Sequence, residues 1–398
     1  MNRIQHEGYN QDAVWKLDSL QDTDSNRKTR SPMTETKLAA TVLATPLSTI
    51  LGSAAKPPGF TEYHGVVTPQ QLDAPNEEIA ALTSRAAAHD LGWMRRVSVR
   101  GNDRFRWLSG MVTNTVKDLG TKTGAWNLVL NSQGRIQGDL TVWREGDSLE
   151  LEFTTDQFER LKAHLEHFII MDDVELVAQD PASETALGLT GPKSSEVLVR
   201  MGLPTLDEPM TSTRVEWNGM DLLVRRDFGT LAPHYELRVP VAGITWLWRA
   251  LSTAGAASVG TAALEAFRIA EGLPTYGTDI IERDLPQETS QTRGLHFSKG
   301  CYLGQEIVER IRSRGNVHRH LRQLELAGPL PASGTELTLE GVAVGHFTSS
   351  AELPLASSNR TFALGMIRAE AEARNTSLTY AVGTATGTAR ILAGPPTL

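Results

Sequence analysis

The only cysteine of the 398-residue chain lies in the run KGCYLGQE, residues 299–306. Gly300 and Gly304 flank it, and glycines allow positive φ angles and a close approach of a ligand or partner. The residues that follow have helical spacing, and a helix N-terminus favours a thiolate through its unpaired N–H groups and partial positive charge. Lys299 adds a further positive charge. We therefore interpret Cys301 as a functional thiol; the alternative is a small cysteine buried in a tight turn.

The expected helix after the cysteine carries two opposite charges four positions apart, Glu306 and Arg310. Such a pair either stabilises a helix surface by about 0.2–0.5 kcal/mol or lines a pocket that the thiol faces, and the sequence leaves both open. Three histidines, His296, His318 and His320, are close in sequence. They allow a Cys–His nucleophile as an alternative to ordinary surface or core histidines.

A second candidate is Asp139, which follows Gly138 at the start of an expected strand. An aspartate in this position is typical of a turn cap. The functional alternative is a carboxylate that points into a cavity and accepts hydrogen bonds from a heterocycle rich in N–H groups.

The composition restricts the classes of function. Hydrophobic residues make up 40% and charged residues 22%, as in globular proteins, and the length indicates two or three domains. The net charge of −8 argues against direct nucleic-acid binding through a basic surface. One cysteine excludes an intramolecular disulfide and a cluster held by four cysteines of one chain, so we expect the reducing cytoplasm. The sequence has no apolar run long enough to span a membrane.

The elements that must position these residues follow from local patterns. Residues 1–60 are expected to form a disordered extension and linker, because the polar first part cannot bury enough apolar surface. Helical spacing is found in residues 77–91, 158–169, 194–201, 244–254 and 262–271, and alternating strands in 96–100, 126–130, 139–143, 186–189, 221–225 and 235–239. Helices and strands do not alternate strictly, which predicts an α+β fold with largely antiparallel sheets. Beyond His320, short strands separated by Gly, Pro and Ser predict a small β-barrel.

The two chemistry-bearing stretches together resemble a known family. The run from Phe297 to Glu306, followed by Arg310 and RGNV at 314–317, resembles the signature of the folate-binding YgfZ proteins. That family belongs to the superfamily of the glycine-cleavage T-protein, an aminomethyltransferase. Weaker similarity covers residues 75–398 in short segments: 110–116, which contains Asn114; 234–236, which contains Tyr235; 268–274; 286–288; and 345–350.

The resemblance implies a ring of subdomains with tetrahydrofolate in a central cavity, two α+β subdomains in residues 75–317 and a C-terminal barrel in 318–398. It implies a role in assembly or repair of iron–sulfur clusters, including those of tRNA-modifying enzymes, with iron–sulfur enzymes or cluster carriers as transient partners. Cys301 would be the working thiol and Lys299 would tune it. The residues expected to bind the folate or shape its site are Asp139, Asn114, Tyr235, Tyr302, Gln305, Glu306 and Arg310.

Some positions depart from the superfamily pattern. The T-protein carries adjacent aspartates, whereas this chain has Gly138 and Asp139, and the segment around Tyr235 lacks a preceding acidic residue. These changes favour folate binding without glycine-cleavage chemistry. Two alternatives remain open: a folate-dependent aminomethyl or one-carbon transferase, and a binding adaptor in which Cys301 is only structural.

Overall fold

The structure is a computed structural model that describes residues 42–315 and 317–398. Its first elements are α1 (Pro46–Gly52) and the hairpin of β1 (Gly59–Tyr63) and β2 (Val66–Gln71). Thr45 caps α1 by accepting a hydrogen bond from the Ser48 N–H (3.1 Å), and Leu47 is fully buried. Residues 42–60 were expected in the disordered extension, but they form α1 and the start of β1 instead. Residues 1–41 lie outside the described part.

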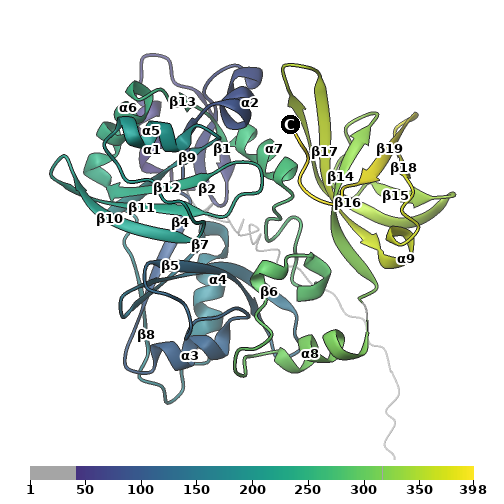
Figure 1. The fold of residues 1–398 in the computed structure, drawn as a ribbon, viewed down its shortest axis with the longest axis horizontal. Coiled ribbons are helices and arrows are strands. Elements are labelled where there is room, and N and C mark those ends of the chain that lie inside the picture. The colour runs from purple at the N-terminus through teal and green to yellow at the C-terminus, as the bar shows by residue number, and fades with distance from the viewer. Residues whose placement is uncertain (1–41, 316) are drawn as a thin grey trace, which may run out of the picture. The chain divides into compact units, whose positions relative to one another are not determined.

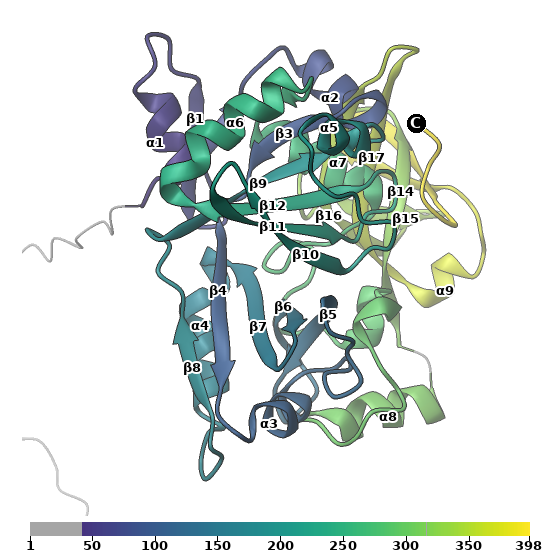
Figure 2. The same cartoon turned by 60° about the vertical axis from the view of Figure 1, so that its left-hand side comes forward.

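One sheet of eleven strands runs through the region before the barrel, in the order β13-β3-β9-β12-β11-β10-β5-β6-β7-β4-β8. Thr211 and Thr123 are the only paired residues between β10 and β5, so the sheet divides there into two groups. Figure 2 shows β9, β11 and β12 above β4, β6 and β7. The bounds are β3 (Ala87–Asp90), β4 (Met94–Arg100), β5 (Thr123–Leu130), β6 (Ile136–Glu145), β7 (Ser148–Thr154), β8 (Glu175–Ala178), β9 (Glu184–Thr190), β10 (Thr211–Trp217), β11 (Met220–Asp227), β12 (His234–Pro240) and β13 (Ala257–Ser258).

Helices pack against both groups of strands. Leu161 and Leu165 of α4 join the buried cluster formed by β4, β6 and β7, and Leu247 and Leu251 of α6 join that of β9, β11 and β12. The helix bounds are α2 (Pro75–Ser84), α3 (Arg104–Met111), α4 (Thr155–Glu166), α5 (Ser194–Arg200), α6 (Ile244–Thr253) and α7 (Thr261–Glu271).

The helix expected over residues 77–91 is shorter than predicted. It ends at Ser84, and residues 87–90 form β3, which pairs with β9 and is buried throughout. The alanines that suggested a continuing helix are needed here for a buried strand, so tertiary pairing overrides local propensity.

The C-terminal region forms a closed barrel in the order β14-β17-β16-β15-β18-β19, with β14 also pairing with β19. Figure 1 shows these strands in yellow-green beside α7. Their bounds are β14 (Arg319–Ala327), β15 (Glu336–Leu339), β16 (Val342–Pro354), β17 (Asn359–Arg368), β18 (Leu378–Val382) and β19 (Ala385–Ile391), with α9 (Ala369–Glu372) between β17 and β18. The expected combination of antiparallel sheets, helices and a terminal barrel is confirmed.

A long connection joins α7 to the barrel and carries the cysteine motif. It contains the short helices η2 (Pro286–Thr289) and η3 (Thr292–Gly294) and then α8 (Gln305–Arg314). Within the described residues, none of the helices combines the length and apolar character that crossing a membrane requires.

Candidate folate site and thiol loop

Asp139 lies near the start of β6, half-buried, with both carboxylate oxygens engaged. Its Oδ2 accepts a hydrogen bond from Trp126 Nε1 and its Oδ1 accepts one from Gln157 Nε2, both at 2.9 Å. Burial raises the pKa of Asp139, although these two donors act in the opposite direction. The carboxylate is therefore fixed in orientation, and it keeps free lone pairs for a further donor.

Gly138, the residue before Asp139, explains why this chain has one aspartate here and not two adjacent ones. A Cβ added to Gly138 would lie 2.7 Å from Gln157 Oε1 and 2.8 Å from both methyl groups of Leu161. Helix α4 thus fills the space that a second aspartate would need. The sequence alone showed that an acidic residue was missing, and the packing shows that a side chain at this position would have to displace Gln157 and Leu161.

A stacked arginine completes the surroundings of Asp139. The Arg293 guanidinium lies 4.3 Å from the ring centroid of Trp126 and 4.6 Å from that of Phe228. Asn114 holds this arrangement by donating from Nδ2 to the backbone oxygens of Trp126 (3.0 Å) and Arg293 (2.7 Å). We call Asp139, Trp126, Gln157, Phe228, Arg293 and Asn114 the Asp139 group. Asn114, an expected binding residue, belongs to it as a positioning residue. Sequence reasoning missed Trp126, Phe228 and Arg293, which lie in three separate segments.

The thiol loop lies close to this group in the fold. Cys301 is exposed, whereas Tyr302 is buried in the same hydrophobic cluster as Trp126. Lys299 Nζ donates to the backbone oxygens of Val112 (2.5 Å) and Asn114 (2.6 Å), and burial lowers its pKa to about 7. Lys299 therefore ties the thiol loop to the Asn114 segment. Within the described residues its ammonium makes no hydrogen bond with the Cys301 thiol.

The loop is shaped by backbone geometry where the helix begins. Gly304 has φ +81° and precedes α8, and a Cβ there would lie 2.6 Å from the Asn131 carbonyl oxygen and 3.0 Å from Gly134 Cα. Gln305 Oε1 accepts the Tyr302 N–H at 3.2 Å. Gln305 thus shapes the loop from inside, and only glycine fits at position 304.

Two expected site residues lie on the surface of α8. Glu306 and Arg310 form a salt bridge of 2.7 Å, with 85% and 54% of their side chains exposed. The structure thus shows the helix-stabilising pair, and these side chains do not reach the Asp139 group. His320, one of the nearby histidines, pairs with Glu372 of α9 at 2.7 Å instead of with the cysteine.

Tyr235 is also placed away from the Asp139 group. It is 2% exposed in the core between β9, β12 and α6, and its hydroxyl lies 3.1 Å from Ser195 Oγ and 3.3 Å from the Leu206 backbone oxygen. The side chain is satisfied within the core, which leaves it a packing role in this structure.

A buried network of charges lies where the two groups of strands meet. Arg225 is fully buried and reaches Glu150 (2.7 Å), Glu152 (3.2 Å) and Glu236 (3.4 Å). Arg96 pairs with Glu152 and Glu236, and Arg238 with Glu150. Although burial acts in the opposite direction, the neighbouring arginines hold the pKa of Glu150 below its usual range. Charged residues inside otherwise apolar strands were the sequence signal for this network.

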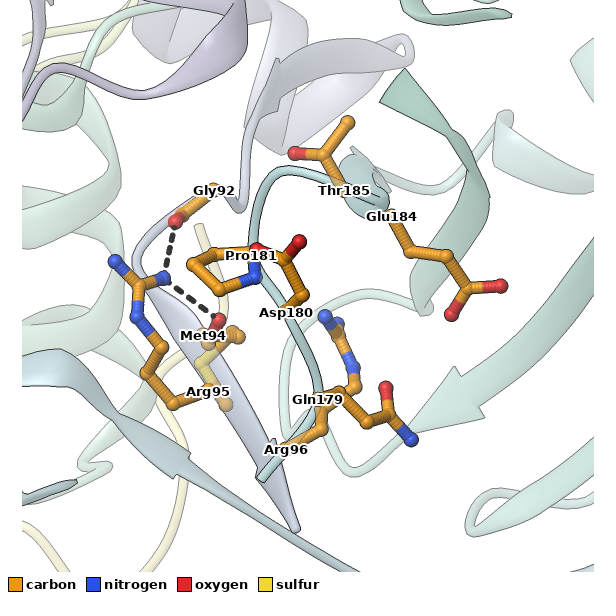
Figure 3. Close-up of a pocket in the computed structure, with 9 residues that line it drawn as sticks. All are labelled: Gly92, Met94, Arg95, Arg96, Gln179, Asp180, Pro181, Glu184 and Thr185. Carbon is orange, nitrogen blue, oxygen red and sulfur yellow. Dashed lines mark hydrogen bonds between the residues drawn. The ribbon is translucent and has the colours of Figure 1, made fainter. Parts of the chain in front are cut away.

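A small cavity borders this network (Figure 3). Arg95, Arg96 and Glu184 are among the residues that line it, and Arg95 donates to the backbone oxygens of Gly92 (3.0 Å) and Met94 (3.1 Å). Its volume of about 20 Å³ is enough for one water molecule. It is therefore too small for a folate.

The fold defines a class of protein, that of chains with a two-part antiparallel sheet and a closed terminal barrel. A family model described as "GCVT N-terminal domain" matches residues 54–299, and the chain belongs to this family. An aminomethyltransferase of Geobacillus kaustophilus is 27% identical over 326 residues, covering 78% of this chain and 87% of the relative.

Two further proteins extend the comparison. A putative chloroplastic transferase of Arabidopsis thaliana is 25% identical over 297 residues, covering 73% of this chain and 67% of its own length. The crystal structure of the glycine cleavage system aminomethyltransferase T from Bartonella henselae has a TM-score of 0.79 at 19% identity, covering 89% of this chain and 98% of that one. The superfamily inferred from the motifs is thus confirmed at the level of the aminomethyltransferase fold.

Proposed function

We propose that the protein binds tetrahydrofolate at the Asp139 group and acts as a folate-dependent one-carbon transferase of the aminomethyl type. The observation that carries the folate part is the oriented, half-buried carboxylate of Asp139 beside the Trp126 ring. The choice of one-carbon transfer is supported by the aminomethyltransferases among the relatives.

The residues present fit a reduced pterin. A carboxylate in a partly desolvated place is a strong acceptor for the N–H groups of such a ring, and an aromatic face beside it offers stacking. When bound, tetrahydrofolate supplies the amine that carries the one-carbon unit. Asp139 accepts an N–H, while Gln157 and Trp126 hold the carboxylate in place.

Titration of the purified protein with tetrahydrofolate, followed by tryptophan fluorescence, tests the binding. Asp139→Ala should weaken saturable binding by at least about tenfold, since a charge-assisted hydrogen bond contributes about 1.5–3 kcal/mol. The matched control is Asp147→Ala, an exposed aspartate of the β6–β7 turn. Equal affinity in wild type and Asp139→Ala would refute the site.

The transfer step needs its own assay. Purified protein given methylenetetrahydrofolate, an ammonium salt and a dithiol as acceptor should transfer the methylene group to nitrogen and sulfur, which forms an S-aminomethyl thioether and free tetrahydrofolate, and Asp139→Asn should slow this transfer. Tight folate binding without turnover would reject the transferase and leave a second candidate.

That second candidate is the YgfZ-type role, support of iron–sulfur cluster assembly or repair, and Cys301 favours it. The thiol is exposed, and its loop is fixed on both sides by Lys299 and Gly304. A single cysteine cannot ligate a cluster alone, so its chemistry would be shared with a partner protein or limited to thiol exchange.

A deletion strain tests this role directly. Wild-type protein should restore the activity of iron–sulfur enzymes, including tRNA-modifying ones, and Cys301→Ser should not. A control is Ser298→Ala, an exposed residue of the same loop. Full restoration by Cys301→Ser would reject the thiol role and leave a folate-binding adaptor or the transferase.

A further inference from the structure

Arg293 is an unusual cation in its surroundings. It is half-buried, and burial lowers its pKa to about 10. Its Nε donates to Gln291 Oε1 at 3.2 Å, but no salt bridge to it occurs within residues 42–315 and 317–398. A charge withdrawn from water without an ion pair is costly, so the two aromatic contacts, together with the Gln291 hydrogen bond, hold the guanidinium in place.

The position of this guanidinium is also informative. It contacts the faces of Trp126 and Phe228, and the carboxylates of Asp139 and Glu271 attract it. A guanidinium is a flat group whose N–H donors match a carboxylate. The amino-pyrimidinone edge of a pterin contains the same N–C(N)–N unit, flat and rich in donors, but it is uncharged.

We infer that Arg293 is a built-in plug, whose guanidinium occupies the stacking place of the pterin ring and must leave before a folate can bind. This inference rests on the proposed folate binding and adds to it the residue that controls access. The binding-competent state is the one in which the Arg293 side chain has turned away from Trp126 and Phe228. The apparent dissociation constant then rises as the fraction of open molecules falls.

The backbone around Arg293 allows this side chain to move alone. Its carbonyl oxygen is held by Asn114 (2.7 Å), and the Gly294 carbonyl oxygen accepts from Thr113 Oγ1 (2.6 Å). The main chain of η3 is thereby fixed, and the long side chain is attached to it through rotatable bonds. A rotamer change therefore opens the place without unfolding the loop.

Removal of the plug gives the test. Arg293→Ala should bind tetrahydrofolate about tenfold more tightly than wild type, because two cation–π contacts no longer compete with the ligand. Arg283→Ala, an exposed arginine of the same connection, is the control and should bind as wild type does. Arg293→Ala binding equally or more weakly, while wild type binds, would overturn the plug and make Arg293 a ligand contact or a bystander.

A ligand-free measurement separates this inference from the proposed function. Acrylamide should quench the fluorescence of Trp126 more strongly in Arg293→Ala than in wild type. The Trp126 contribution is obtained for each of these two proteins as the difference from the same protein carrying Trp126→Phe. If neither protein binds tetrahydrofolate, the proposed function fails, and the quenching result alone decides whether Arg293 covers the ring. Unchanged quenching would refute the cover independently of any folate.

Discussion

Replacing Arg225 by methionine should strongly destabilise the protein, because the arginine pairs with three glutamates, of which Glu152 and Glu236 are buried. Its guanidinium lies 2.7, 3.2 and 3.4 Å from Glu150, Glu152 and Glu236, and none of it is exposed. Arg96 and Arg238 would then face the three carboxylates alone, leaving one negative charge uncompensated. Removal of one partner from a buried ion pair costs about 3–5 kcal/mol, a large part of the roughly 5–15 kcal/mol that stabilises a typical protein.

Urea unfolding followed by tryptophan fluorescence measures this cost. At pH 7 the midpoint of Arg225→Met should fall with little change in the slope against urea. The deficit should shrink as the pH is lowered towards 5. Without Arg225, burial raises the carboxylate pKa values above those of the unfolded chain, so the folded variant gains stability by binding protons.

Arg214→Met is the matched control. Arg214 lies on the neighbouring strand β10 and pairs with Asp221 at 2.6 Å, with 42% and 61% of the two side chains exposed. An exposed pair of this kind contributes about 0–1 kcal/mol. A deficit for Arg225→Met no larger than that of Arg214→Met, or one independent of pH, would refute the reasoning.

Three other changes test further contacts through the melting temperature. Gly138→Ala should cost about 1–3 kcal/mol by overpacking against Gln157 and Leu161, and an unchanged melting temperature would show that α4 yields. Burial, with neighbouring carboxylates adding to it, raises the pKa of Asp227. The wild-type protein thus loses stability as the pH rises from the ordinary aspartate pKa to this raised pKa, because the folded state then holds an unfavourable buried charge. Asp227→Asn should therefore be more stable than wild type at pH 8 but not at pH 3. Lys299→Met should cost about 1–3 kcal/mol by leaving two backbone carbonyls without their donor; a loss below that range contradicts the tie between the two segments.

Much of the fold could be predicted because its strands and helices carry clear periodicity. The strand expected at 221–225 is the centre of β11, and the helix expected at 244–254 is α6. The joining of the two sheet groups could not be predicted, since it depends on residues far apart in the chain, among them the Thr123–Thr211 pair and the charge network. Charged residues inside apolar strands mark the members of the network, but local patterns do not tell which of these distant residues pair.

The candidate site was predicted in part. Asp139 and Asn114 lie together as expected, and the Cys301 loop is tied to them through Lys299. The sequence could not show whether Tyr235 binds a ligand or packs in the core, because the residues next to it in the chain would be the same in both cases. Arg293 gave no signal at all, since its role depends on two rings that come from β5 and from the segment after β11.

The packing of the barrel on α7 has a consequence for how this chain can be divided. Leu353 and Phe362, from β16 and β17, are fully buried in the same cluster as Ile79 of α2 and Phe267 of α7. The segment matched by the family model ends at residue 299, well before these two side chains. A cut in the connection between α7 and the barrel would leave complementary apolar surfaces exposed on both fragments. Neither fragment is therefore an independent module. Expressed apart, they should aggregate or recombine, and a protein that kept the residues matched by the family model without the barrel is disfavoured by the same physics.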